Sequence, residues 1–156
     1  MRIEISGSQT LVIENLLLDF NGTLAQNGKI SDKVRQIIIE LSENLKLCVA
    51  TADTRGNAST ECSGLPLELL ELPGGMPEDE AKLKLLEKLG KDRTAVVGNG
   101  RNDALTLADA TLGICVLGEE GAHKRAVAAA QVLVHSIEDA LGLFVDTNRL
   151  VATLRY

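Results

Sequence analysis

Four separate segments of this 156-residue sequence carry polar or charged side chains at the ends of apolar runs or within a helical pattern. Asp19 follows an apolar run and is followed by Phe20-Asn21-Gly22-Thr23, and Thr51 ends a second apolar run. Lys82 lies in a stretch of helical periodicity, and a further apolar run ends in Gly98-Asn99-Gly100-Arg101-Asn102-Asp103. Phosphoryl transfer needs an oxygen nucleophile, cations that neutralise the nonbridging oxygens, and hydrogen-bond donors that face them. If the fold brings the segments together, Asp19, Lys82 and Thr51 supply one group of each kind.

The position of Lys82 on its helix is informative. Lys82 shares the i, i+3, i+4, i+7 stripe with Leu85, Leu86 and Leu89, which is the face that a helix turns to the core. A buried ammonium group is costly unless it is paired, so we expect an anion beside its tip. The alternative is a Lys82 stem packed along the rim of the core with its charge reaching water. The other lysines of this region occupy another face: Lys84, Lys88 and Lys91.

The elements that would position these groups alternate along the chain. Six apolar stretches alternate with stretches of helical periodicity, which is typical of a mostly parallel sheet covered by helices on both faces. The predicted fold class is therefore α/β, a Rossmann-like three-layer α/β/α sandwich with a mostly parallel central sheet. The predicted strands are 15–18, 45–50, 67–70, 95–98, 112–116 and 131–134.

Helices and domain limits follow from the same patterns. One helix is predicted behind the capping residues Ser31 and Asp32, and the others at 77–89, 102–110 and 119–130, with one or two more over 137–154. We expect a single domain over 1–156. Its parts are an N-terminal β-hairpin in 1–14 (strands 2–6 and 10–13), a catalytic core in 15–135 and a C-terminal helical segment in 136–156.

Composition and charge argue against several partners. A net charge of −6 repels phosphate backbones, and 2% aromatic residues leave few rings for base stacking, so no nucleic acid is expected. No apolar run approaches the ~18–20 residues that span a bilayer, so no membrane is expected either. The first residues do not resemble a secretory signal, and the cysteines have no metal-ligand spacing. We therefore expect a cytoplasmic protein. Cys48 and Cys115 are expected to be buried, and Cys62 is the one cysteine for which an exposed position is considered.

Together, the four segments resemble the motifs of the haloacid dehalogenase (HAD) superfamily, over about residues 12–135. Residues 19–23 are similar to its Asp-x-Asp-x-Thr motif, and Thr51 and Lys82 to its second and third motifs. Residues 98–103 resemble Gly-Asp-Gly-x-Asn-Asp, as P-type ATPases and their soluble relatives carry it. The resemblance implies that Asp19 is a phosphoryl-accepting nucleophile, that Thr51 donates to a phosphoryl oxygen, and that Lys82 neutralises both nucleophile and phosphate.

The resemblance also implies a phosphate and a Mg²⁺ beside Asp19. Asn102 is expected to orient the site through a hydrogen bond to Lys82 or Thr51, and the amides of the turn at 21–23 to form a small anion nest. The implied phosphate-binding residues are Phe20, Asn21, Gly22, Thr51, Ala52, Lys82 and Asn102. The implied metal ligands are Asp19, the backbone carbonyl of Asn21, Asn99 and Asp103.

Two amides depart from the superfamily pattern. Asn21 stands at the catalytic position of the general acid/base Asp, and an amide cannot carry a proton at neutral pH. Asn99 stands where the superfamily places a direct Mg²⁺ ligand, and it offers a carbonyl oxygen without charge. We therefore expect slow turnover and weaker metal binding.

The spacing of the motifs leaves no room for a cap domain, since 27 residues separate Thr23 from Thr51 and 30 separate Thr51 from Lys82. The expected function is Mg²⁺-dependent hydrolysis of a phosphate monoester or acyl phosphate, with a small phosphorylated substrate or a phosphoprotein as partner. A homo-oligomer is one way to close such an open site. The alternative is a weak or inactive HAD-fold domain that binds a regulatory partner. A receiver domain and a dinucleotide-binding domain fit less well, because the acidic pair and the third glycine that they need are absent.

Overall fold

A parallel sheet of six strands forms the centre of the computed structural model, which describes residues 1–7, 10–53 and 56–155. The strand order is β5-β4-β3-β6-β7-β8, and every neighbouring pair is parallel. From β3 the chain adds β4 and β5 on one side, and it then returns to add β6, β7 and β8 on the other side, so the strand order reverses between β3 and β6. Ligands of open α/β sheets bind in the crevice outside the carboxyl ends of the strands at such a point. The strands are β3 (Asn15–Asp19), β4 (Lys46–Thr51), β5 (Glu68–Glu71), β6 (Thr94–Gly98), β7 (Leu112–Val116) and β8 (Val132–Val134).

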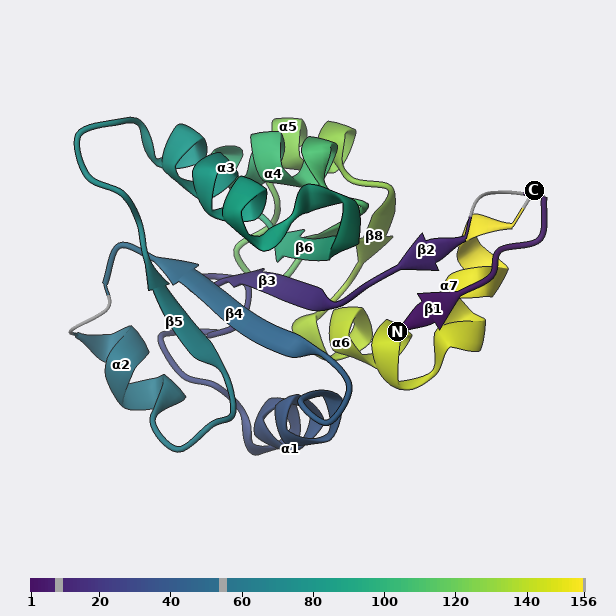
Figure 1. The fold of residues 1–156 in the computed structure, drawn as a ribbon. Coiled ribbons are helices and arrows are strands. Elements are labelled where there is room, and N and C mark those ends of the chain that lie inside the picture. Colours follow the sequence, from purple (N-terminus) through teal and green to yellow (C-terminus); the bar gives the residue numbers. More distant parts are fainter. Residues whose placement is uncertain (8–9, 54–55, 156) are drawn as a thin grey trace.

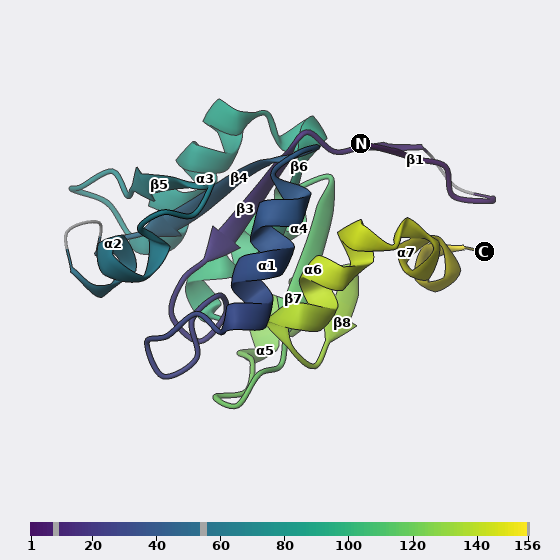
Figure 2. The same ribbon diagram turned by 90° about the horizontal axis from the view of Figure 1, so that it is seen from below.

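Helices cover both faces of this sheet (Figure 1). One face carries α3 (Glu78–Leu89), α4 (Ala104–Asp109) and α5 (Lys124–Ala129). The other carries α1 (Asp32–Leu41) and α6 (Ile137–Val145), which lie side by side (Figure 2). The remaining elements are α2 (Asn57–Cys62), α7 (Thr147–Leu154), the antiparallel pair β1 (Arg2–Ile3) and β2 (Leu11–Val12), and the 3-10 turns η1 (Lys91–Arg93) and η2 (Arg101–Asp103).

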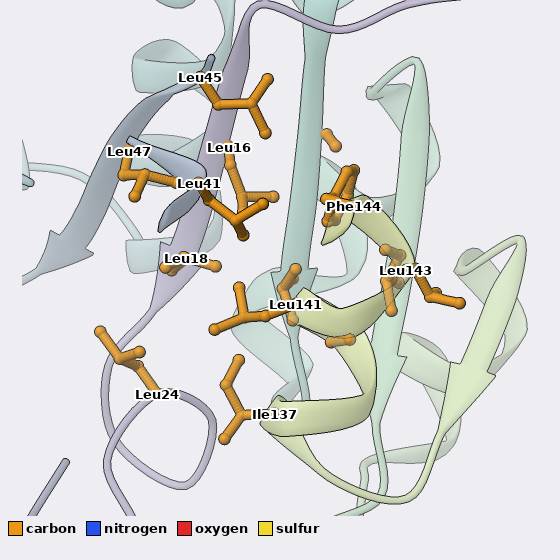
Figure 3. Close-up of a cluster of buried hydrophobic side chains, with 14 of the residues drawn as sticks. Leu16, Leu18, Leu24, Leu41, Leu45, Leu47, Ile137, Leu141, Leu143 and Phe144 are labelled. Carbon is orange, nitrogen blue, oxygen red and sulfur yellow. The ribbon is translucent and has the colours of Figure 1, made fainter. Parts of the chain in front are cut away.

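Alternating residues of β3 divide the core into two halves. Leu16 and Leu18 pack with Leu41 of α1 and Leu141 of α6 (Figure 3). Leu17 belongs to the second hydrophobic cluster, which lies against α3 and α4. Because successive side chains of a strand point to opposite faces, Asp19 lies on the Leu17 side of the sheet. The alternation of side chains along β3 thus places the Asp19 carboxylate on the face of the sheet that α3 covers.

The predicted fold class is confirmed: the sheet is parallel, helices cover both faces, and no cap domain is inserted among the described residues. The paired residues of the N-terminal hairpin, Arg2 with Val12 and Ile3 with Leu11, form shorter strands than predicted. Ser8 and Gln9 of its turn, and Tyr156 of the C-terminal segment, lie outside the described residues. No helix in the described part of the chain is long and apolar enough to cross a membrane.

The structure corrects three details. The helix predicted at 119–130 begins only at Lys124, because residues 117–123 form a loop with Gly118 and Gly121 at positive φ. The helix α2 was not predicted. It turns Cys62 toward the core at 5% exposure, so this thiol is buried as Cys48 and Cys115 are. Burial raises the pKa of all three thiols to about 11.

Candidate active site

The carboxyl ends of three neighbouring strands bring the predicted groups together. In the register of β3 and β4, Asp19 lies opposite Ala50, so Thr51 is the next residue along the adjacent strand. On the other side of β3, β6 ends at Gly98 and continues into the segment that contains Asp103. The helix α3 lies over this edge and carries Lys82.

Lys82 joins two carboxylates at the centre of the site. Its Nζ donates to Oδ1 of Asp19 at 2.6 Å and to Oδ1 of Asp103 at 2.6 Å. The side chains of Lys82, Asp19 and Asp103 are 3%, 13% and 2% exposed. The predicted anion beside Lys82 is therefore confirmed, and the alternative in which its charge reaches water is wrong. Glu78, one helical turn before Lys82, lies 3.8 Å from the same Nζ.

Burial controls the protonation of this cluster. Desolvation raises the pKa of Asp19 from 3.8 to about 6, and the neighbouring Asp103 carboxylate adds to this rise, against the opposing effects of Lys82 and Thr23. Burial lowers the pKa of Lys82, but Asp19 and Asp103 outweigh it, so the net shift is upward. Lys82 is therefore an ammonium ion between two carboxylates. One positive charge does not balance two negative ones, so the site favours a further cation.

Asp103 also organises the loop that follows β6. Its Oδ2 accepts hydrogen bonds from the backbone N–H groups of Asn99 at 3.1 Å and Gly100 at 2.8 Å. Because Oδ1 is bound to Lys82, both oxygens of Asp103 have protein partners. A Cβ added at Gly98 would lie 2.5 Å from the Asp103 Cγ, so a residue without a side chain is needed there. A metal-ligand role for Asp103 requires it to exchange or share one of these partners.

The turn after β3 is tied to Asn99. The Thr23 hydroxyl donates to Oδ1 of Asn99 at 3.2 Å, and Nδ2 of Asn99 donates to the Gly121 carbonyl at 3.3 Å. Within the turn, the Gly22 N–H donates to the Ala25 carbonyl at 3.0 Å. The Gly22 amide thus has a protein partner, and its predicted role in binding phosphate requires it to exchange or share this hydrogen bond. The φ of +73° at Gly22 is the left-handed conformation that glycine tolerates best.

The other predicted phosphate-binding residues are arranged unequally. The Thr51 Oγ1 accepts from the Asp53 N–H at 3.1 Å, which leaves the hydroxyl proton for a ligand. The ring of Phe20 is buried and Ala52 is exposed. Because neither side chain has a hydrogen-bond donor, both residues would bind a phosphate through their backbone N–H groups. Asn102 was predicted to form a hydrogen bond with Lys82 or Thr51, and its side chain has a different partner.

Asn102 instead donates from Nδ2 to Glu78 at 2.8 Å. This contact links η2 to the first turn of α3, and sequence reasoning missed it. The i, i+4 spacing of Glu78 and Lys82 indicates that these two side chains are neighbours on the helix, but it says nothing about Asn102. Beside the contact lies an open pocket of about 550 Å³. Its lining residues are Pro77, Glu78, Asp79, Glu80, Arg101 and Asn102.

The donor set can be tested against Mg²⁺. Among the residues that the structure describes, no group of three or more His, Cys, Asp or Glu side chains could hold a metal ion. Mg²⁺, however, is usually bound by one or two carboxylates, with waters and phosphate oxygens completing its shell. Asp19 supplies a carboxylate. The backbone carbonyl of Asn21 follows it by two residues, and the side-chain oxygen of Asn99 lies 3.2 Å from the hydroxyl of Thr23 in the same turn. The residues fit Mg²⁺ in this incomplete form, with less negative charge than a site of two free carboxylates.

Comparisons of sequence identify two relatives, both from Methanocaldococcus jannaschii, and no protein-family model matches. The chain is 46% identical over 82 residues to the uncharacterized protein MJ0073, a match that covers 50% of this chain and 88% of that protein. It is 22% identical over 146 residues to a soluble P-type ATPase-like phosphatase. That match covers 90% of this chain but 52% of the phosphatase, so the chain spans about half the length of this relative.

Solved structures share the fold at low sequence identity. A protein from Legionella pneumophila, described as a HAD superfamily (subfamily III A) hydrolase, matches with a TM-score of 0.70 at 14% identity, over 90% of this chain and 86% of that chain. The cobalt-bound deoxy-D-mannose-octulosonate 8-phosphate phosphatase of Haemophilus influenzae matches with 0.68 at 14% identity, over 92% and 94%. The 3-deoxy-D-manno-octulosonate 8-phosphate phosphatase of Moraxella catarrhalis, with magnesium and phosphate ions, matches with 0.64 at 15% identity, over 92% and 94%. At these identities the likeness concerns the fold.

Proposed function

Because this chain belongs to one family with MJ0073 and has the fold of haloacid dehalogenase superfamily hydrolases, we propose that it is a phosphatase that acts through Asp19. The resemblance that its four segments carry is confirmed in the fold. The observation that carries the proposal is the position of Lys82, whose Nζ lies 2.6 Å from the carboxylates of both Asp19 and Asp103. A buried cation beside a strand-end carboxylate is what transfer of a dianionic group to that carboxylate requires.

The proposed reaction has two displacements at phosphorus. An oxygen of Asp19 forms a bond to phosphorus while the bond to the leaving oxygen breaks, and the leaving group takes a proton from water. A water molecule then attacks the phosphoryl group on Asp19, which restores the carboxylate and releases phosphate and a proton. Lys82 neutralises the nonbridging oxygens, and the free hydroxyl proton of Thr51 donates to one of them. Because Asn21 cannot shuttle the proton, we expect slow turnover.

A divalent cation completes the proposal. Asp19, the Asn21 backbone carbonyl and the Asn99 side-chain oxygen would hold Mg²⁺, with Asp103 joining if it shares an oxygen with Lys82. The ion would supply positive charge to the phosphoryl oxygens that Lys82 does not reach.

The substrate class is a small phosphate monoester or an acyl phosphate, with a phosphoprotein as the larger alternative. The open pocket beside Glu78 and Asn102 leaves room for the remainder of such a substrate. The solved structures with this fold include sugar-acid phosphate phosphatases, which supports a small substrate. A cytoplasmic location and a homo-oligomer stay predictions.

The test is hydrolysis of p-nitrophenyl phosphate and acetyl phosphate, with Mg²⁺ or with EDTA. The wild-type protein is expected to hydrolyse at least one of the two compounds with Mg²⁺ but not with EDTA. Asp19→Asn is expected to lose this activity. Asp109→Asn is the matched control, since Asp109 is an exposed carboxylate of α4 that pairs with Lys91 at 3.0 Å. Activity that survives Asp19→Asn would reject Asp19 as nucleophile. If the wild-type protein hydrolyses neither compound and binds no Mg²⁺, the partner-binding alternative is favoured.

A further inference from the structure

The loop that follows β7 packs on the turn that follows β3. Asn99 holds this loop twice: its carbonyl accepts from the His123 N–H at 2.9 Å, and its Nδ2 donates to the Gly121 carbonyl at 3.3 Å. From the other side, the position of a Cβ on Gly118 would lie 3.4 Å from the Gly22 carbonyl oxygen. The loop therefore lies against the candidate site and is fixed by a side chain of that site.

The loop brings a carboxylate that the mechanism does not use. A Cβ added at Gly22 would lie 2.5 Å from Oε2 of Glu120 and 2.9 Å from Nδ2 of Asn99. The Glu120 carboxylate and the Asn99 amide thus meet over Gly22, next to Asn21. Within the described part of the chain, the Glu120 carboxylate has no hydrogen bond or ion pair. Its neighbour Glu119 is directed elsewhere and accepts from Asn27 at 3.5 Å.

The orientation of the Asn99 amide explains why an amide stands there. Its oxygen faces the Thr23 hydroxyl and its nitrogen faces the loop. An aspartate at position 99 would lose the donor to Gly121 and would bring a second negative charge beside Glu120. Asn99 and Glu120 are therefore compatible with each other, whereas a carboxylate in place of the Asn99 amide would repel Glu120.

We infer that Glu120 supplies, to a divalent cation bound at this site, the negative charge that Asn99 lacks. The inference rests on the proposed function, because it concerns the cation of that phosphatase. It accounts for the departure at position 99, since the carboxylate has moved from the end of β6 to the loop after β7. It also gives a reason for Gly22, because any side chain there would displace Glu120.

The test is Mn²⁺ binding by the full chain, measured by electron paramagnetic resonance of the free ion in the absence of phosphate. Glu120→Gln is expected to weaken binding by about ten- to a hundredfold, the usual effect of removing a partner from the surroundings of a metal. Glu119→Gln, which removes the same charge from the adjacent exposed position, is expected to leave the affinity unchanged. Adding Asn99→Asp to Glu120→Gln is expected to restore binding, because it returns one carboxylate without repulsion.

Each outcome decides between the inference and its premise. Equal Mn²⁺ affinity of wild type and Glu120→Gln, an equal loss in Glu119→Gln, or no recovery in the double variant would overturn the role of Glu120 while leaving the phosphatase intact. No Mn²⁺ binding by the wild-type protein would overturn the inference together with the metal part of the proposed function. Glu120 is exposed, so thermal unfolding is expected to be the same for all Gln variants, and that measurement excludes misfolding as the cause.

Discussion

Asp19→Asn is expected to stabilise the protein at neutral pH while it abolishes hydrolysis. The pKa of Asp19 rises from 3.8 to about 6 on folding, first because of burial and then because of Asp103. This difference of about two units corresponds to about 3 kcal/mol at 1.36 kcal/mol per unit. Since the folded pKa lies above the unfolded one, this stabilisation is complete below about pH 4 and is lost as the pH rises through about 6. A side chain that cannot ionise does not lose it.

Urea unfolding followed by circular dichroism, in EDTA, measures this effect. At about pH 4 the free energies of unfolding of wild type and Asp19→Asn are expected to agree. At about pH 8 the variant is expected to be more stable by ~3 kcal/mol. The control Asp109→Asn removes an exposed ion pair with Lys91, so it is expected to change stability by less than ~1 kcal/mol at both pH values. A variant no more stable than wild type at pH 8, or a gain in stability that is independent of pH, would mean that folding does not raise the pKa of Asp19.

Three further changes test the packing of the site. Lys82→Met leaves the buried Asp19 carboxylate without its cation, so it is expected to destabilise the protein by about 3–5 kcal/mol at pH 8 and by less at pH 5. The control Lys84→Met, at an exposed position, is expected to have little effect. Equal losses of unfolding free energy for the two variants in urea would contradict the buried ion pair. Gly22→Ala, at φ +73° and against Glu120, is expected to cost about 1–2 kcal/mol in the same assay and to weaken Mn²⁺ binding; an unchanged affinity would mean that Glu120 need not lie there. Leu86→Ala is expected to cost about 2–5 kcal/mol, because Leu86 is fully buried on the face of α3 that carries Lys82, and a smaller loss would show a loosely packed interface.

Local patterns were sufficient for the parts of the site that lie on regular elements. The apolar run before Asp19 and the stripe of Lys82 with its leucines follow from strand and helix periodicity, and both are seen in the structure. Their convergence followed from the parallel sheet, because the carboxyl ends of parallel strands share one edge.

Loops were predicted poorly because their partners are distant in sequence. Residues 119–123 have the composition of a helix start, but the contacts of Asn99 with Gly121 and His123 hold them as a loop. The hydrogen bond between Asn102 and Glu78 and the approach of Glu120 to Gly22 likewise depend on how separate elements pack. Such contacts leave no periodic signal in the sequence.

Covalent phosphorylation of the protein shows directly whether Asp19 accepts the phosphoryl group. The protein is incubated with acetyl phosphate and Mg²⁺, quenched in acid and digested, and its peptides are analysed by mass spectrometry. The role of Asp19 as nucleophile predicts one added phosphoryl group on Asp19 of the wild-type protein and none in Asp19→Asn. A phosphoryl group on another residue, or hydrolysis without any labelled Asp19 under these conditions, would contradict it.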